Sequence, residues 1–568
     1  MNMMKKRIIR DYLSSLKEDN ELDYIFPILL SAMNFRLIST PRNSKGQPQY
    51  GKDVVAIGKN ADGKICRWYF ELKGNAAKDI NDTTFNVKDG VRDSILAAID
   101  VSYTDSSIPL LNNLPEIIVF VHNGILVENN RTQFDSFIAK HFPNGGFERW
   151  DIDVLTDLFF KYLFDENLFC DDESYTLFKK ILVYLDTPGL NVADLDRLID
   201  IQLSLCPTDG KKKRTLIKCF AALNLMLVIL FSESQKNENL LPAKIASDRL
   251  VLKLWAWMLK HNMTENNLIK GIFGKIVYLH LQVYSSYINK ILPLAQMYKG
   301  LYLYRGGESE RICYSLRCYD FLNDLLYYLN ALQAYNRFTQ DNINEMQALV
   351  MKVIEMNSGF DMPLLDTHSI TLQLLTKFLF CRQHKKEIEL SYFNFIIKLV
   401  INVIMRKRGY DMYPELHSNK KALAESLYKK SPDYQDSSSL FLLSLIEILA
   451  WTDYKELYAK LREQIILSKI NLQVAYPIVY DDLEIRLFEH RLYEEMSVET
   501  NIQLDETLDE FKKNFRKKYN HIYLKTENSE YSFLQLLAHI HYQTDMFPDF
   551  LNLGFWEPLS KEKKENNQ

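Results

Sequence analysis

Residues 51–74 read GKDVVAIGKNADGKICRWYFELKG, and this stretch decides the fold of the first part of the chain. Two β-like arms flank Asn60-Ala61-Asp62-Gly63, which predicts a type I turn with Gly63 in the left-handed region, a common hairpin loop. Asn60 then pairs with Lys64. Because the two residue numbers of each pair in an antiparallel hairpin have a constant sum, Asp53 falls opposite Glu71.

The open end of this hairpin gathers charged side chains on one face. Opposite residues point to the same side, and alternation along the strand adds Lys73 to Asp53 and Glu71. The apolar side chains between them point the other way, into the expected core: Trp68, Phe70 and Leu72. Two carboxylates at this spacing can share a hard cation such as Mg²⁺. Lys73 can then hold or help to deprotonate an attacking water, or stabilise charge building on a phosphate. The alternative is an exposed surface ion pair.

Short β-like runs and amphipathic helices alternate around the hairpin. Further strands are predicted at residues 35–40, 117–121 and 147–150, and helices up to residue 34, from about 91, from about 131 and after 151. The apolar run 117–121 indicates a strand buried on both faces, which requires helices on both sides of a mixed sheet. The first part of the chain is therefore predicted to be an α/β domain.

Asp53 followed by Glu71-Leu72-Lys73, in an α-β-β-β-α-β order of elements, resembles the PD-(D/E)xK restriction-endonuclease-like superfamily, and its Mrr-like branch in particular. The resemblance covers about residues 15–165. It implies that Asp53 and Glu71 bind Mg²⁺ or Mn²⁺ and that Lys73 is the catalytic lysine. Many members add an acidic residue from the first helix. Asp23 stands at that place, with Glu21 as second choice, and Pro27 is expected to kink this helix.

Charge and cysteine usage restrict the partners and the compartment. The 568 residues carry a formal net charge of −4, yet residues 31–80 hold nine Lys or Arg against four Asp or Glu, which favours an anionic partner. The seven cysteines form no CxxC pair, so neither a disulfide framework nor a zinc ribbon is encoded, and a reducing cytoplasm fits best. The most apolar run, 219–231, has 13 residues with Asn224 inside it. A membrane span needs roughly 20, so none is expected.

From about residue 168 onward, apolar residues recur three and four positions apart, which is the spacing of amphipathic helices. We predict a nuclease-like α/β domain over 1–168, an all-α region over 169–555 that forms an irregular helical array, and a loose polar tail over 556–568. The basic runs 211–214 and 406–408 can bind phosphates, but such runs are more often solvated loops, which is the preferred interpretation. Arg305-Gly306-Gly307-Glu308 lacks the pattern of a phosphate-binding loop, so no nucleoside triphosphate site is predicted.

These features predict a divalent-metal-dependent endonuclease that hydrolyses phosphodiester bonds, with double-stranded DNA as the first choice of substrate and RNA as the second. The resemblance implies a prokaryotic restriction or antiphage defence effector. The helical region is expected to bind a protein partner, to mediate self-association or to clamp nucleic acid. The alternative is a non-enzymatic scaffold in which the nuclease-like fold is a relic.

Overall fold

The computed structural model describes residues 2–41, 50–74, 78–104, 108, 111–163, 172–185, 192–208, 212–335, 339–380, 384–477, 482–491, 496–519 and 531–544. The chain divides into two compact units, residues 1–279 and 280–568. The boundary predicted at residue 168 and the tail predicted over 556–568 both fall outside the described residues.

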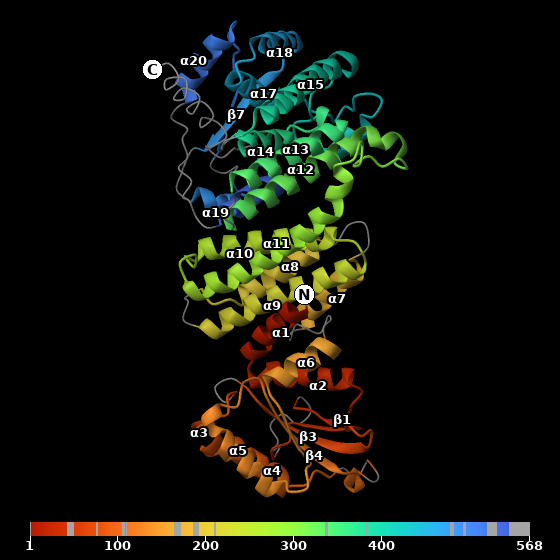
Figure 1. Cartoon of the computed structure of the whole chain (residues 1–568), viewed down its shortest axis with the longest axis vertical. Coiled ribbons are helices and arrows are strands. Elements are labelled where there is room, and N and C mark those ends of the chain that lie inside the picture. Colours follow the sequence, from red (N-terminus) through yellow and green to blue (C-terminus); the bar gives the residue numbers. More distant parts are fainter. Residues whose placement is uncertain are drawn as a thin grey trace. The chain divides into compact units, whose positions relative to one another are not determined.

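A five-stranded mixed sheet lies in the first unit (Figure 1). Its strands are β1 (Arg36–Ser39), β2 (Val54–Lys59), β3 (Ile65–Lys73), β4 (Glu116–His122) and β5 (Phe147–Trp150), in the spatial order β1-β2-β3-β4-β5. The pairs β1–β2 and β2–β3 are antiparallel, whereas β3–β4 and β4–β5 are parallel. The prediction of a mixed sheet in an N-terminal α/β region is confirmed.

The hairpin between β2 and β3 has the predicted register. Val54 lies opposite Phe70, and the pairing continues without a shift to Lys59 opposite Ile65. The turn closes through a 2.9 Å hydrogen bond from the Gly63 backbone N–H to the Asn60 carbonyl oxygen, and Gly63 has a φ of 77°. The same register, continued by one residue beyond β2, brings Asp53 opposite Glu71.

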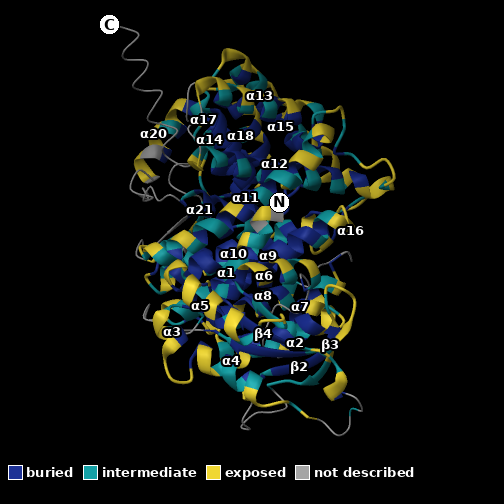
Figure 2. Ribbon diagram, turned by 60° about the horizontal axis from the view of Figure 1, so that its bottom comes forward, coloured by how far each residue is buried: buried dark blue, intermediate teal, exposed yellow. Residues whose placement is uncertain are grey.

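Helices cover both faces of this sheet. On one face α2 (Asp23–Ala32) and the start of α6 (Ile152–Tyr162) pack near the aromatic side chains of β3, and the rings of Phe26 and Phe70 are 5.3 Å apart. On the other face α3 (Asp82–Asn86), α4 (Val91–Asp100) and α5 (Glu128–His141) form a core with Phe120 and Tyr69. Strand β4 is therefore buried on both sides, as predicted, and it is dark blue in Figure 2.

The start of the chain differs from the single helix that was expected. Helix α1 (Asn2–Ser15) is followed by a π-helical turn (Glu18–Leu22) and then by α2. Asp19 and Asn20 inside the turn have non-helical dihedral angles, with a φ of 60° at Asn20, a conformation that asparagine tolerates. Pro27 lies within α2, and the break occurs before it.

Helices that follow the sheet in sequence also belong to the first unit. They are α7 (Asp172–Val183), α8 (Val192–Ser204), α9 (Lys213–Lys236), α10 (Leu241–Lys260) and the first part of α11 (Asn267–Ala295). Helix α1 packs against α9, and the Arg214 guanidinium donates to the carbonyl oxygens of Ser15 and Leu16 at the end of α1. The sheet and these helices therefore belong to one compact unit, and the packing of α1 on α9 joins them.

Two described helices, α9 and α15 (Lys386–Tyr410), are long and apolar enough to cross a bilayer by length and composition alone. Most of the apolar window of α9 is buried inside the protein, and less than half of that of α15 is buried. The burial of α9 agrees with its packing between α1 and α10.

The second unit is mostly helical. Its longer helices are α12 (Glu310–Tyr335), α13 (Gln340–Met356), α14 (His368–Phe380), α15, α17 (Leu440–Trp451), α18 (Lys455–Ser468), α20 (Leu508–Tyr519) and α21 (Phe533–Tyr542), with short α16 (Lys420–Glu425) and α19 (Leu483–Phe488). Helix α17 is nearly all buried, and the buried Asp366 carboxylate accepts from the backbone N–H groups of Leu440 and Phe441 at its start.

A small sheet corrects the prediction that residues 169–555 are entirely helical. It consists of β6 (Ser438–Ser439), β7 (Asn471–Pro477) and β8 (Met496–Thr500). Strand β7 is parallel to β6 and antiparallel to β8, and it packs on α17. Leu472 and Val474 are buried on either side of Gln473, but Ala475 is buried as well, so the alternation of period two breaks and the strand does not stand out from the helices around it.

Candidate active site

Asp53, Glu71 and Lys73 meet at the end of β3. The Leu72 backbone N–H donates to Asp53 Oδ2 at 2.7 Å, which holds the aspartate against the neighbouring strand. Lys73 Nζ lies 2.7 Å from Glu71 Oε1. The structure therefore brings together the three residues that the hairpin register predicted.

Glu18 joins this group from the π-helical turn. Its Oε1 lies 3.4 Å from Lys73 Nζ, and its Oε2 accepts from the Gly74 backbone N–H at 3.1 Å. The approach depends on a glycine, because a Cβ on residue 74 would lie 2.7 Å from the Glu18 backbone nitrogen. We call Glu18, Asp53, Glu71 and Lys73 the carboxylate–lysine cluster.

The acidic residues expected from the first helix lie elsewhere. Asp23 begins α2 and is hydrogen-bonded by the backbone of its own turn. Glu21 lies 2.7 Å from Lys218 Nζ of α9 and accepts from the Lys17 backbone N–H. Because the helix breaks before Asp23, the described contacts place Glu18 beside the cluster in the position for which we predicted Asp23.

The segment before Asp53 is anchored to α4. Gly51 has a φ of 70°, and a Cβ there would lie 2.2 Å from the carbonyl oxygen of Ser94. The buried Lys52 donates to the carbonyl oxygens of Ala98 and Val101 at the end of α4. A cation is favourable at the C-terminus of a helix, so this contact of Lys52 fixes the position of Asp53, the residue just before β2.

Burial sets the electrostatics of the cluster. The Glu71 side chain is 6% exposed and that of Lys73 is 16% exposed, which does not fit the alternative of an exposed surface ion pair. Burial, reinforced by the charge of Glu71, raises the pKa of Asp53 to about 8. Burial also raises the pKa of Glu18. Burial alone would lower the pKa of Lys73, but the Glu71 and Glu18 carboxylates outweigh it and raise that pKa above its usual value.

A divalent cation suits this donor set. Ionising all three carboxylates beside a single ammonium places excess negative charge where water stabilises it poorly, which is why the pKa of Asp53 is raised. A divalent cation would offset that charge and favour the ionised form of Asp53. Within the described part of the chain, no three metal-binding side chains stand close enough to form a site by themselves. Mg²⁺ needs only one or two carboxylates when water and phosphate oxygens complete its shell, and Asp53 with Glu71 provides that pair.

The local excess of positive charge is partly used inside the protein. Four of the nine cations in residues 31–80 contact other parts of the chain: Lys52, Arg67, Lys73 and Lys78. Three are exposed: Arg36, Lys59 and Lys64. The other two, Arg42 and Lys45, are outside the described residues. The charge count is thus a weaker sign of an anionic partner than the sequence alone suggested.

His122 lies beside the cluster, and its side chain contacts the backbone of another segment of the chain. It pairs with Lys73 across the parallel strands, and its Nδ1 lies 2.7 Å from the carbonyl oxygen of Lys78. Burial lowers its pKa to about 4, so the ring is neutral and donates that hydrogen bond. His122 is the last residue of β4.

Comparison of the chain with protein-family models, with curated proteins and with solved structures finds no match.

Proposed function

We propose that the chain is a divalent-metal-dependent nuclease of the PD-(D/E)xK type. The observation that carries this proposal is the pair of carboxylates, Asp53 and Glu71, opposite one another at the end of a hairpin with Lys73 on the same face. The order of elements along the chain supports it: α2, β1, β2, β3, α4 and β4 follow one another in the α-β-β-β-α-β order that belongs to the resemblance.

Asp53 and Glu71 would hold one or two Mg²⁺ or Mn²⁺ ions, with Glu18 as a further acidic neighbour. When bound, such an ion would supply an acidified water and would stabilise negative charge on the phosphodiester. The hydrogen bond from Leu72 orients Asp53, and the contact with Gly74 orients Glu18.

Lys73 would act as a cation and not as a base. The Glu71 and Glu18 carboxylates hold its pKa above the usual value, so the side chain keeps its proton at neutral pH. A charged ammonium can orient the attacking water and stabilise the charge that builds on the phosphate, which is the second of the two tasks expected from the sequence.

Double-stranded DNA is the proposed substrate, with RNA as the second choice, and the cytoplasm is the proposed compartment. The overall charge of −4 supports control by something other than avid DNA binding, since non-specific affinity comes mainly from neutralised phosphates. We assign that control to the helical region, through a protein partner or a second copy of the chain, as in a restriction or antiphage effector.

The rival proposal is a non-enzymatic scaffold in which the cluster only joins the π-helical turn to β3. The contacts of Glu18 with Lys73 and Gly74 are the observation that favours it. A structural contact of this kind needs no metal, so metal binding separates the two proposals.

Calorimetric titration of the full chain with Mn²⁺ tests the proposal. We expect saturable binding that Asp53→Asn abolishes, because the amide still accepts from Leu72 but cannot provide a carboxylate. Asp62→Asn, in the exposed turn of the same hairpin, is the matched control and should bind like the parent. Equal Mn²⁺ affinity for the parent and for Asp53→Asn would refute the site. Where binding is seen, Mn²⁺-dependent cleavage of linear DNA that chelation stops tests the reaction.

A further inference from the structure

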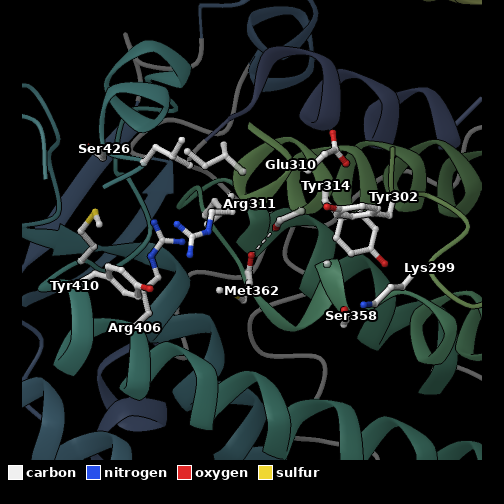
Figure 3. Close-up of a pocket in the computed structure, with 16 residues that line it drawn as sticks. Lys299, Tyr302, Glu310, Arg311, Tyr314, Ser358, Met362, Arg406, Tyr410 and Ser426 are labelled. Carbon is white, nitrogen blue, oxygen red and sulfur yellow. Dashed lines mark hydrogen bonds between the residues drawn. The ribbon is translucent and has the colours of Figure 1, made fainter. Parts of the chain in front are cut away.

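The second unit contains a cavity of about 420 Å³ (Figure 3). It lies among the loop that follows α11, the start of α12, a 3-10 turn at Ser358–Asp361 and the segment from the end of α15 to α16. A cavity of this volume falls in the range that small-molecule ligands occupy. All of its lining residues belong to the second unit, so it is separate from the carboxylate–lysine cluster.

The charged side chains of the lining are mostly cations. Three cations line the cavity: Lys299, Arg311 and Arg406. Among the lining residues that the structure describes, Glu310 is the single acid; it is buried and lies 2.5 Å from Arg317, and it accepts from the Leu303 backbone N–H at 2.9 Å. Because its charge is already paired, Glu310 leaves the three cations of the lining unbalanced.

Arg406 differs from the two basic residues that follow it. Lys407 lies 2.7 Å from Asp411, and Arg408 donates to Gln464 at 2.9 Å. Arg406 instead donates to the hydroxyl oxygen of Tyr434 at 3.5 Å, which is the limit of a hydrogen bond. The basic run 406–408 is therefore no simple solvated segment, since one of its members faces the cavity.

Arg311 and Arg406 approach the cavity from different helices, and in Figure 3 their guanidinium groups point toward one another. Arg311 has one carboxylate neighbour, Glu308, at 3.6 Å, and both side chains of that pair are more than half exposed, where ion pairs contribute little. Two like charges directed at one place repel each other unless an anion lies between them. Guanidinium groups bind phosphate in pairs of parallel hydrogen bonds.

Three tyrosines also line the cavity: Tyr302, Tyr314 and Tyr410. Tyr302 and Tyr314 lie with ring centroids 5.3 Å apart, and Tyr314 donates to Asn357 at 3.3 Å, which fixes its ring. Tyr410, at the end of α15, is 53% exposed and lies at the rim. Exposed and fixed tyrosine rings offer surfaces on which a planar base can stack.

We propose that this cavity binds a nucleotide, with its phosphate between Arg311 and Arg406 and its base against the tyrosines. The combination of paired guanidinium groups and aromatic rings in one cavity carries the assignment. Sequence motifs predicted no such site because the lining comes from segments 299–315, 358–364 and 406–427, and Arg305-Gly306-Gly307-Glu308 contributes no lining residue.

Calorimetric titration of the full chain in EDTA tests this site, since without a divalent ion the proposed nuclease site does not hold phosphate. The probes are ATP, AMP, ribose 5-phosphate and inorganic phosphate. We expect one nucleotide per chain, with AMP binding about tenfold or more tightly than ribose 5-phosphate, since one base stack contributes roughly 1 to 3 kcal/mol. Glu71→Gln should leave this binding unchanged.

Arg406→Gln should weaken nucleotide binding by about tenfold or more, the loss expected for a hydrogen bond between charged groups. Arg408→Gln, on the same helix with its contact outside the cavity, is the matched control. Arg311→Gln removes the second guanidinium at an exposed position and replaces Arg406→Gln if that variant melts early. The proposal is overturned if neither nucleotide gives saturable heat, if the cavity variants bind like Arg408→Gln, or if ribose 5-phosphate binds as tightly as AMP.

Discussion

Gly74→Ala tests whether the Glu18 segment lies against the end of β3. The glycine does not need a left-handed backbone there, so alanine introduces no conformational strain. Its Cβ would, however, lie 2.7 Å from the Glu18 nitrogen and 3.1 Å from both Glu18 Cα and the Lys17 carbonyl carbon. All three neighbours are backbone atoms, which cannot rotate away.

The size of the effect follows from these distances. Ordinary contact begins at 3.4 Å, so the Glu18 backbone must retreat by 3.4 − 2.7, about 0.7 Å. A retreat along that line stretches the 3.1 Å hydrogen bond from Gly74 to Glu18 to about 3.8 Å, beyond hydrogen-bond range. Overpacking of this kind costs about 1 to 3 kcal/mol in the free energy of unfolding.

Thermal melting measures the loss of stability, and Mn²⁺ calorimetry measures the effect of displacing the Glu18 carboxylate. The melting temperature of the first unit should fall by about 2 to 4 °C for each kcal/mol lost. The Mn²⁺ affinity should change by the same factor in Gly74→Ala as in Glu18→Gln, since both remove the Glu18 carboxylate from its place. Gly271→Ala in α11 is the matched control, because a Cβ there meets no atom within 4 Å. If Gly74→Ala melts no lower than Gly271→Ala, the packing of residues 17 and 18 on Gly74 is refuted.

Three further outcomes are expected. Lys73→Met should lower the melting temperature in EDTA, because the Glu71 and Glu18 carboxylates lose their buried cation. Addition of Mn²⁺ should restore the melting temperature. A variant that melts at the same temperature as the parent in EDTA would contradict this. Burial lowers the pKa of His368 to about 3, below its unfolded value, so the unfolded state binds more protons and stability is lost as pH falls from about 6.5. His368→Asn should remove about one proton from that dependence between pH 6 and 4, measured by urea unfolding, and an unchanged slope would disprove it. A fragment of residues 1–279 should be soluble and fold cooperatively by circular dichroism, whereas 1–168 should aggregate because it exposes the face of α1 that packs on α9, and a well-folded 1–168 fragment would contradict that packing.

The local part of the site could be predicted because short-range geometry fixes it. The turn at Asn60–Gly63 sets the hairpin register, and the register alone brings Asp53 opposite Glu71. The alternation of β3 then determines which side chains enter the core. None of these steps needs a contact between distant parts of the sequence.

Glu18 could not be found in this way. Its place depends on a helix break at Asn20 and on the absence of a side chain at Gly74, more than fifty residues along the chain. The position predicted for Asp23 assumed one helix continuing to residue 34. An acidic run such as Glu18-Asp19-Asn20-Glu21, with an asparagine inside it, is the signal that could have indicated the break.

The packing of α1 on α9 and the cavity of the second unit could not be predicted, for a similar reason. The contact of α1 with α9 joins segments about 200 residues apart, and the cavity draws on three separate segments. The spacing of apolar residues indicates where a helix forms. It does not show which other helix packs against it.

A crystal of the full chain soaked in MnCl₂ gives the most direct measurement of the central claim, because anomalous scattering locates manganese independently of any activity. We predict a manganese peak bounded by the carboxylates of Asp53 and Glu71, absent from crystals of Glu71→Gln treated in the same way. Manganese found only at other sites, with Lys73 Nζ still 2.7 Å from Glu71 Oε1, would contradict the assignment of this cluster as a metal-dependent nuclease site.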